Sequence, residues 1–213
     1  MSRRVLLGTA LASVAQLAVG CGDSHRKAKA VGSSSPTVSA VDGTVVMVIR
    51  HGEKPTSGRT GIDDSGRPDR KSLTARGWER ARALPGLFTA PRAGLARPAT
   101  VFAAADHGPH AGAHRMRQTV TPLARHLRLT VDTDFAEGSE QQLAQAALTA
   151  PRPVLICWEH TRIPAIVAGL GAVDAPGVPS VWPDRFDLVW VFRHRAGTWS
   201  FTQVEQHLLP GDQ

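Results

Sequence analysis

Residues 44–49 place the strongest restriction on the fold, because this run of six apolar or β-branched residues carries no charge. The run then breaks abruptly into Arg-His-Gly-Glu-Lys at residues 50–54. A continuous apolar run of this kind is typical of a strand buried on both faces, as in a parallel sheet. Ligands of open α/β sheets bind beyond the carboxyl ends of the strands, so residues 50–54 mark a candidate site. Gly52 is expected to let the backbone turn sharply and to let a ligand approach closely.

Three segments resemble a known family. Residues 50–52 resemble the RHG signature of the histidine phosphatase superfamily, the phosphoglycerate-mutase-like proteins. Residues 73–84 resemble the family's LTxxGxxQA helix, with Arg80 in the usual place of glutamine, and residues 115–124 resemble its RAxQTxxPLA segment. The resemblance covers about residues 44 to 206. It implies an α/β fold, a three-layer α/β/α sandwich with a central, mostly parallel sheet.

Apolar periodicity predicts the remaining elements. Buried strands are predicted at 100–105 and 153–158, a short edge strand at 127–131, and a terminal antiparallel hairpin from 186–192 and 198–204. Helices are predicted at 73–84, 115–124, 138–148 and 163–171. If the βαβ connections are right-handed, the ends of the buried strands converge at one edge of the sheet.

Four side chains at predicted strand and helix ends form the candidate site. The resemblance implies that His51 attacks phosphorus, that Arg50 and Arg115 bind the phosphate, and that His160 is the second histidine. Two guanidinium forks suit phosphate oxygens, and an imidazole with one unprotonated nitrogen is a nucleophile. Arg117 competes with Arg115 for the phosphate, because helical residues two apart lie on different faces. This chemistry needs positioning and charge stabilisation, so we expect no metal and no cofactor.

The proton donor stays open among four glutamates, Glu53, Glu137, Glu140 and Glu159. We favour Glu159 for its proximity to the second histidine, with Glu53 next. Consecutive residues of an extended chain point to opposite faces, which counts against Glu159. The alternative is that these glutamates only pair with arginines.

Two loops could modify the site. The loop at 55–71 overhangs a strand end and is expected to decide the substrate. The loop after the second strand holds a set that could bind a metal, Asp106, His107, His110 and His114. Its spacing matches no zinc signature, so solvated imidazoles are the simpler interpretation.

The N-terminal pattern predicts export to the bacterial cell envelope. Residues 1–21 begin with a twin-arginine-like motif, continue as an apolar run too short to span a membrane, and end in a lipobox-like sequence at Cys21. The two expected outcomes are lipidation of Cys21, which would anchor the protein to the membrane, and cleavage nearby. Residues 22–40 predict a flexible linker, and residues 41–213 the histidine phosphatase domain.

Charge argues against a nucleic-acid partner. The formal charge is +7, but five of the 25 basic residues and one of the 18 acidic residues precede residue 41, which leaves +3 for the remainder. That charge is too mild for binding to DNA or RNA, and the chain lacks tyrosine for base stacking. Cysteine occurs only at Cys21 and Cys157, so Cys157 is expected to be a small buried hydrophobic residue on a strand.

These features predict a metal-independent phosphatase that hydrolyses phosphomonoesters through a phosphohistidine on His51, with a small phosphorylated substrate as its partner. The alternative is an exported anion- or phosphate-binding lipoprotein with an inactive histidine-phosphatase fold. A mutase is disfavoured, because export would remove the protein from the glycolytic pool. Small phosphomonoesters, phytate-like compounds and phosphoproteins all fit as substrates.

Overall fold

A computed structural model of the chain describes residues 38–90 and 94–213. The folded unit described below extends from Pro36 to Gln213, over its described residues. The predicted export signal, and nearly all of the predicted linker, lie outside the described residues. No helix of the described part has the length and apolar character needed to cross a membrane.

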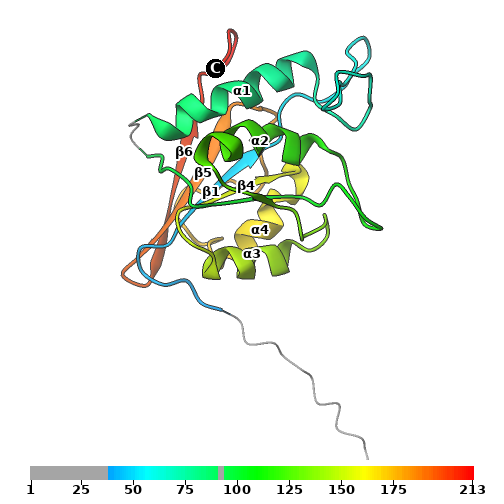
Figure 1. The fold of residues 1–213 in the computed structure, drawn as a ribbon. Helices are drawn as coiled ribbons and strands as arrows, with labels where there is room; N and C mark the ends of the chain where they lie inside the picture. The colour runs from blue at the N-terminus through cyan, green and yellow to red at the C-terminus, as the bar shows by residue number, and fades with distance from the viewer. Residues whose placement is uncertain (1–37, 91–93) are drawn as a thin grey trace, which may run out of the picture. The chain divides into compact units, whose positions relative to one another are not determined.

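A six-stranded sheet forms the middle layer, in the order β3-β2-β4-β1-β5-β6 (Figure 1). The four strands from β3 to β1 are parallel, whereas β5 and β6 form an antiparallel hairpin beside β1. The strands are β1 (Val45–Arg50), β2 (Thr100–Ala103), β3 (Val131–Asp132), β4 (Val154–Trp158), β5 (Leu188–Arg195) and β6 (Thr198–Glu205). The sheet is therefore mostly parallel, as predicted.

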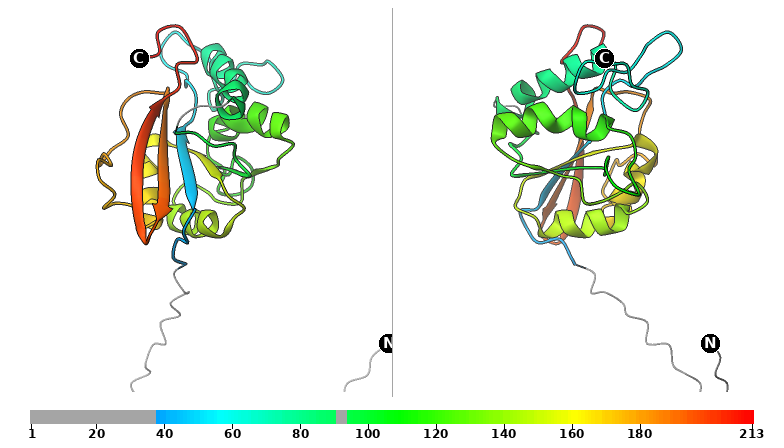
Figure 2. Two further views of the ribbon diagram at one scale, coloured as in Figure 1. Left: turned by 90° about the vertical axis from the view of Figure 1, so that its left-hand side faces the viewer. Right: turned by 45° about the vertical axis from the view of Figure 1, so that its right-hand side comes forward.

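Two pairs of helices cover the sheet (Figure 2). The helices α1 and α2 pack against each other, and α3 packs against α4. Because the chain reverses its direction across the sheet after β3, the right-handed connection from β3 to β4 places α3 on the opposite face, and α4 packs against α3 there. The helices are α1 (Ala75–Thr89), α2 (Arg115–Leu127), α3 (Glu140–Thr149) and α4 (Ile163–Gly169), with a 3₁₀ turn η1 (His160–Arg162) before α4.

The register of β1 and β4 positions the candidate site. Both strands are fully buried along most of their length, as their uniformly apolar sequences predicted. Arg50 pairs with Trp158, so the two strands end level with each other. The next residues, His51 and Glu159, therefore leave the sheet side by side at its carboxyl edge.

One predicted element is misplaced. The edge strand expected at 127–131 is the two-residue strand β3, because α2 continues as far as Leu127 and buries that side chain. The helix then stops at Arg128, whose left-handed backbone (φ 60°) ends it. Cys157 is fully buried on β4, as predicted.

Candidate active site

The turn after β1 is held by hydrogen bonds to two neighbouring elements. The amide of His51 donates to the carbonyl of Trp158 (3.2 Å), and the amide of Gly52 donates to Thr119 Oγ1 (2.8 Å). Thr119 in turn donates to the carbonyl of Arg115 (2.7 Å) at the start of α2. The position of the turn is therefore fixed relative to both β4 and α2.

The space at Gly52 is restricted by a helix, and its backbone is not in a left-handed turn. Its φ angle is outside the positive range, and a Cβ on it would lie 3.1 Å from the carbonyl oxygen of Gly77 in α1. A Cβ on Gly77 would lie 2.7 Å from the carbonyl oxygen of Glu53. The close approach expected at Gly52 is thus made by the α1 backbone, through a pair of facing glycines.

His51 is held in one tautomer. Its side chain is buried, and Nδ1 lies 2.7 Å from the carbonyl oxygen of Gly52, which can only accept. Nδ1 therefore carries the proton, and Nε2 carries the lone pair. Burial lowers the pKa of His51 to about 3, and the charges of Arg115 and Arg50 lower it as well, against the hydrogen bond to Gly52. His51 is consequently a neutral imidazole.

The buried Arg50 and the half-buried Arg115 both act electrostatically on this imidazole, and each keeps a donor without a protein partner. Nη1 of Arg50 donates to Asp184 (3.0 Å), and its guanidinium stacks on Phe186, 4.0 Å from the ring centre. Nη1 of Arg115 donates to the carbonyl of Arg70 (3.4 Å). The Nε atoms of Arg50 and Arg115 are buried and have no hydrogen-bond partner. Buried donors of this kind suit an anion.

Arg117, the competing candidate for the phosphate, is already paired. Its Nε lies 2.5 Å from Asp106, and its Nη2 lies 2.8 Å from Asp64. Burial alone would lower the pKa of Arg117, but the bonds to these two aspartates raise it. The structure therefore leaves Arg115, and not Arg117, with a donor available for a ligand.

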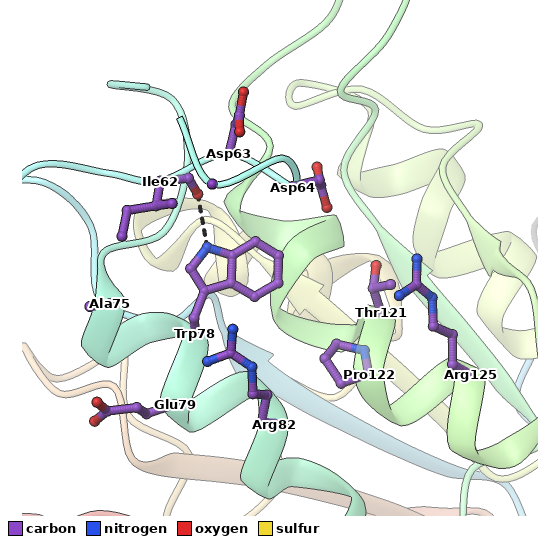
Figure 3. A pocket seen from close by; sticks show the side chains of 11 residues that line it. Ile62, Asp63, Asp64, Ala75, Trp78, Glu79, Arg82, Thr121, Pro122 and Arg125 are labelled. Carbon is purple, nitrogen blue, oxygen red and sulfur yellow. Dashed lines mark hydrogen bonds between the residues drawn. The ribbon is translucent and has the colours of Figure 1, made fainter. Parts of the chain in front are cut away.

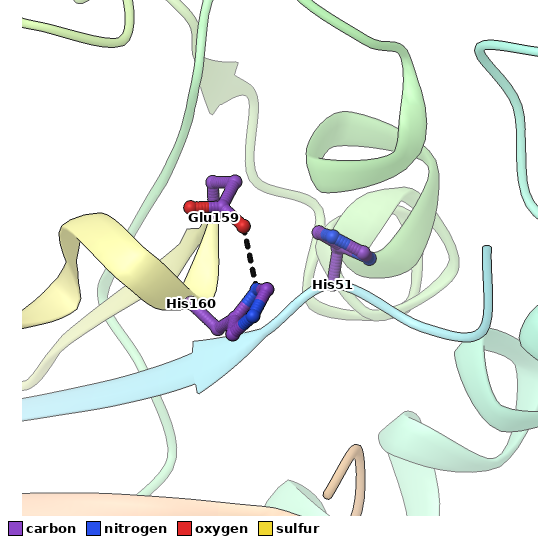
Figure 4. Close-up of side chains that lie close together, drawn as sticks. All are labelled: His51, Glu159 and His160. Carbon is purple, nitrogen blue, oxygen red and sulfur yellow. Dashed lines mark ion pairs between the residues drawn. The ribbon is translucent and has the colours of Figure 1, made fainter. Parts of the chain in front are cut away.

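Glu159 and His160 lie beside His51 (Figure 4). Nδ1 of His160 lies 2.5 Å from Oε1 of Glu159, at ion-pair distance without hydrogen-bond geometry. Oε2 of Glu159 accepts from the amide (2.8 Å) and the hydroxyl of Thr161. Burial acts to raise the pKa of Glu159, but the bonds from Thr161 and the charge of His160 bring it below its ordinary value. Glu159 is therefore an ionised carboxylate that lies against the second histidine.

Two of the other candidate glutamates are engaged elsewhere. Both carboxylate oxygens of Glu53 accept from Arg80, at 2.8–3.3 Å. Glu140 is buried and accepts from the indole of Trp158 (3.0 Å). These contacts give both residues a structural partner.

Glu137 is the fourth candidate glutamate, over which the sequence favoured Glu159 and Glu53. Burial raises its pKa, and the charge of Glu159 raises it further, whereas Arg162 and Arg115 oppose the rise. The backbone at Gly112 covers it, because a Cβ there would lie 2.9 Å from Glu137 Oε1. Glu137 thus shares the electrostatic surroundings of Arg115 and Glu159, and it favours the protonated form more than an ordinary glutamate.

The loop at residues 106–114, called the histidine loop below, is organised around the buried carboxylate of Asp106. Nδ1 of His107 and Nδ1 of His114 lie 2.6 and 3.0 Å from the two oxygens of Asp106, which Arg117 also contacts. His110 is exposed. Within the described residues this loop forms no cluster of ligand atoms close enough for a metal. The ligand atoms of His51, Glu159 and His160, by contrast, all lie within 4.8 Å of one another.

A separate cavity of about 590 Å³ lies between residues 62–66, α1 and α2 (Figure 3). The indole of Trp78, which donates to the carbonyl of Ile62 (2.8 Å), lines it together with charged side chains of both signs. None of the four predicted site residues lines this cavity.

Solved structures share the fold. Neither protein-family models nor curated proteins gave a match to the sequence. A candidate α-ribazole-5′-P phosphatase from Escherichia coli is 14% identical, with a TM-score of 0.50, and the alignment covers 77% of this chain and 97% of that one. An α-ribazole phosphatase from Shigella flexneri is 15% identical (TM-score 0.48, covering 80% and 100%). A phosphoserine phosphatase variant from Entamoeba histolytica is 13% identical (TM-score 0.46, covering 78% and 98%).

These neighbours are members of the histidine phosphatase superfamily, which the RHG resemblance had indicated. At 14% identity, the likeness to the Escherichia coli structure establishes the fold alone. It confirms the predicted phosphoglycerate-mutase-like architecture.

Proposed function

We propose that this chain is a phosphatase that hydrolyses phosphomonoesters through a phosphohistidine on His51, without a metal. The observation that carries the proposal is the buried imidazole of His51, whose Nδ1–H is bound to the Gly52 carbonyl. The charges of Arg50 and Arg115 both act on this imidazole, and the Nε donors of both arginines are buried without partners. A neutral nucleophile together with unused cationic donors is the arrangement that phosphoryl transfer requires.

The reaction has two steps. In the first, Nε2 of His51 attacks phosphorus and the bond from phosphorus to the ester oxygen breaks, while Arg50, Arg115 and His160 bind the non-bridging oxygens. The leaving oxygen takes a proton, and the alcohol departs. In the second, water attacks the phosphohistidine, the bond from nitrogen to phosphorus breaks, and inorganic phosphate leaves with His51 restored.

We assign the role of proton donor to the leaving oxygen to Glu137. Its raised pKa favours the protonated form that must donate to the leaving oxygen, and its carboxylate then accepts a proton from the attacking water. Glu159 is held ionised against His160, which suits it to positioning that ring. Glu53 is held by Arg80 and is assigned no proton-transfer role.

The fold shared with the candidate phosphatase of Escherichia coli is consistent with this activity. We further propose that the protein is exported to the cell envelope, that a lipid on Cys21 is its membrane contact if it has one, and that its substrate is a small phosphorylated molecule and not a nucleic acid. The charge distribution and N-terminal pattern of the sequence support these assignments.

The test is hydrolysis of an aryl phosphate by the full chain in EDTA, beside His51→Ala. We expect turnover in EDTA, loss of turnover in the variant, and an acid-labile phosphoenzyme when the reaction is quenched in base. Phosphate binding without turnover would support the inactive binding protein instead. Turnover that persists in His51→Ala would refute the assignment of the nucleophile.

A further inference from the structure

Three side chains of the candidate active site lie close enough together to bind one metal ion. The proposed hydrolysis does not require such binding. The ligand atoms of His51, Glu159 and His160 lie within 4.8 Å of one another, at the adjacent ends of β1 and β4 (Figure 4). Two imidazoles and one carboxylate, with a fourth position open, are a typical donor set for Zn²⁺. We propose that this trio is an inhibitory zinc site that excludes phosphate.

Two of the three ligands are already oriented by other contacts. A histidine that binds a metal usually donates its second ring N–H to a carbonyl or carboxylate. His51 does so from Nδ1 to the Gly52 carbonyl (2.7 Å), which leaves Nε2 for the metal. Oε2 of Glu159 is held by the Thr161 amide (2.8 Å), so Oε1, which lies 2.5 Å from Nδ1 of His160, would be the oxygen that binds the metal. Tetrahedral zinc with bonds of about 2.0–2.1 Å separates its ligand atoms by roughly 3.4 Å. The present separations extend from 2.5 Å, between Glu159 and His160, up to 4.8 Å, so small side-chain rotations bring the three ligands to that spacing.

The charges around the trio tolerate a dication. Arg50 and Arg115 would repel it, but each already faces carboxylates. Arg50 is paired with Asp184 at 3.0 Å, and Glu137 and Glu159 both interact with Arg115. Three carboxylates thus oppose the two guanidiniums. Of the other nearby cations, Arg162 is engaged with Glu137 and Glu140 at 3.7–3.8 Å, and Lys54 acts on His160.

Zinc on Nε2 of His51 would occupy the lone pair that attacks phosphorus, so zinc and phosphate compete. This inhibition rests on the proposed function, whereas zinc binding does not. The rival zinc ligands are His107, His114 and Asp106, but the guanidinium of Arg117 lies 2.5 Å from the Asp106 carboxylate. A fixed positive charge at that distance disfavours a metal in the histidine loop.

The experiment is a calorimetric titration of ZnCl₂ into the full chain, after EDTA treatment and dialysis into phosphate-free buffer. We expect one site of highest affinity that weakens about tenfold or more in Glu159→Gln and in His160→Asn, the scale of loss for disturbed metal ligation. His107→Gln is the matched control and should bind as the wild type does. Circular dichroism melts establish that each variant is folded, and the second ligand variant serves if the first does not fold.

A second readout needs no turnover. Co²⁺ in a four-coordinate site should give visible absorption bands that are lost in Glu159→Gln and His160→Asn and that diminish when tungstate, a phosphate mimic, is added. Unchanged zinc affinity in both ligand variants, loss of affinity in His107→Gln, or indifference to tungstate would overturn the inference.

Activity separates this inference from the proposed function. If the chain hydrolyses the ester in EDTA, if excess zinc inhibits this hydrolysis, and if further EDTA restores it, both the zinc site and the phosphatase function are supported. Hydrolysis that saturating zinc leaves unchanged overturns the inference alone. Zinc binding by the trio in a chain that hydrolyses no phosphate ester supports the site and overturns the phosphatase.

Discussion

Replacing Arg80 by glutamine tests whether Glu53 has a structural role. The Arg80 side chain is only 3% exposed and lies between the carboxylates of Glu53 and Asp212. Its Nη2 donates to both of them at 2.8 Å, and its Nη1 donates to Asp212 at 3.0 Å. Burial alone would lower the pKa of Arg80, but these bonds raise it. The guanidinium is therefore the main counter-charge for two nearly buried carboxylates.

The expected loss of stability follows from what remains after the substitution. Arg80→Gln leaves Glu53 and Asp212 with side chains only 11% and 3% exposed. Removing one partner of a buried ion pair costs about 3–5 kcal/mol. Arg76 still contacts the two carboxylates at 3.3 and 3.5 Å, so we expect the lower end of that range, about 3 kcal/mol.

Urea unfolding followed by circular dichroism measures this loss. Arg125→Gln, at an exposed arginine of α2, is the matched control and should change the free energy of unfolding by about 0.5 kcal/mol or less. The double variant Arg80→Gln/Glu53→Gln should lose less stability than the two single losses added together, because the residues are in contact. A loss below about 1 kcal/mol in Arg80→Gln would refute the argument. A Glu53→Gln variant that stays stable but loses turnover would support the catalytic role predicted from the sequence.

Three further predictions concern chemistry, binding and packing. Glu137→Gln should slow hydrolysis of alkyl phosphates by about 10²–10⁴-fold and of p-nitrophenyl phosphate far less, because a good leaving group needs little protonation; Glu159→Gln should slow both alike. Equal losses in Glu137→Gln would refute its role as the acid. Asp184→Asn should lower KM for an aryl phosphate about threefold, since a 95% exposed carboxylate then no longer competes for a phosphate-binding arginine; an unchanged or higher KM would contradict this. In urea unfolding, Gly77→Ala should destabilise by about 1–3 kcal/mol, because its Cβ would lie 2.7 Å from a backbone oxygen. Gly86→Ala, on the same helix with open space, should stabilise by about 0.5–1 kcal/mol, and similar effects at both glycines would refute the packing argument.

The sheet was predictable because its central strands are buried on both faces. Uniformly apolar runs of this length are typical of strands buried on both faces, so residues 44–49 and 153–158 predict β1 and β4. The edge strand β3 is only two residues long and half-buried, so it leaves no such pattern. Its position depends on where α2 ends, and the sequence signals that end only weakly.

The candidate site was predictable where its residues lie at strand and helix ends. Arg50, His51 and Arg115 could be identified from short motifs that belong to single segments. Asp184 could not, because its bond to Arg50 joins residues 134 positions apart and involves an exposed loop. Such contacts are set by how β5 approaches β1, which no local pattern records.

Glu159 shows why alternation along a strand fails where active sites lie. The period-two rule would separate the Glu159 side chain from that of its neighbour, His160, if the chain stayed extended. β4 ends at Trp158, however, and Glu159 is the first residue of a turn that its own side chain caps by accepting from the Thr161 amide. Glutamate is not among the preferred capping residues, so the sequence gives no warning of the turn. Because the turn begins at that residue, the carboxylate and the imidazole of His160 both lie beside His51, in the arrangement on which the proposed ring positioning and the zinc site depend.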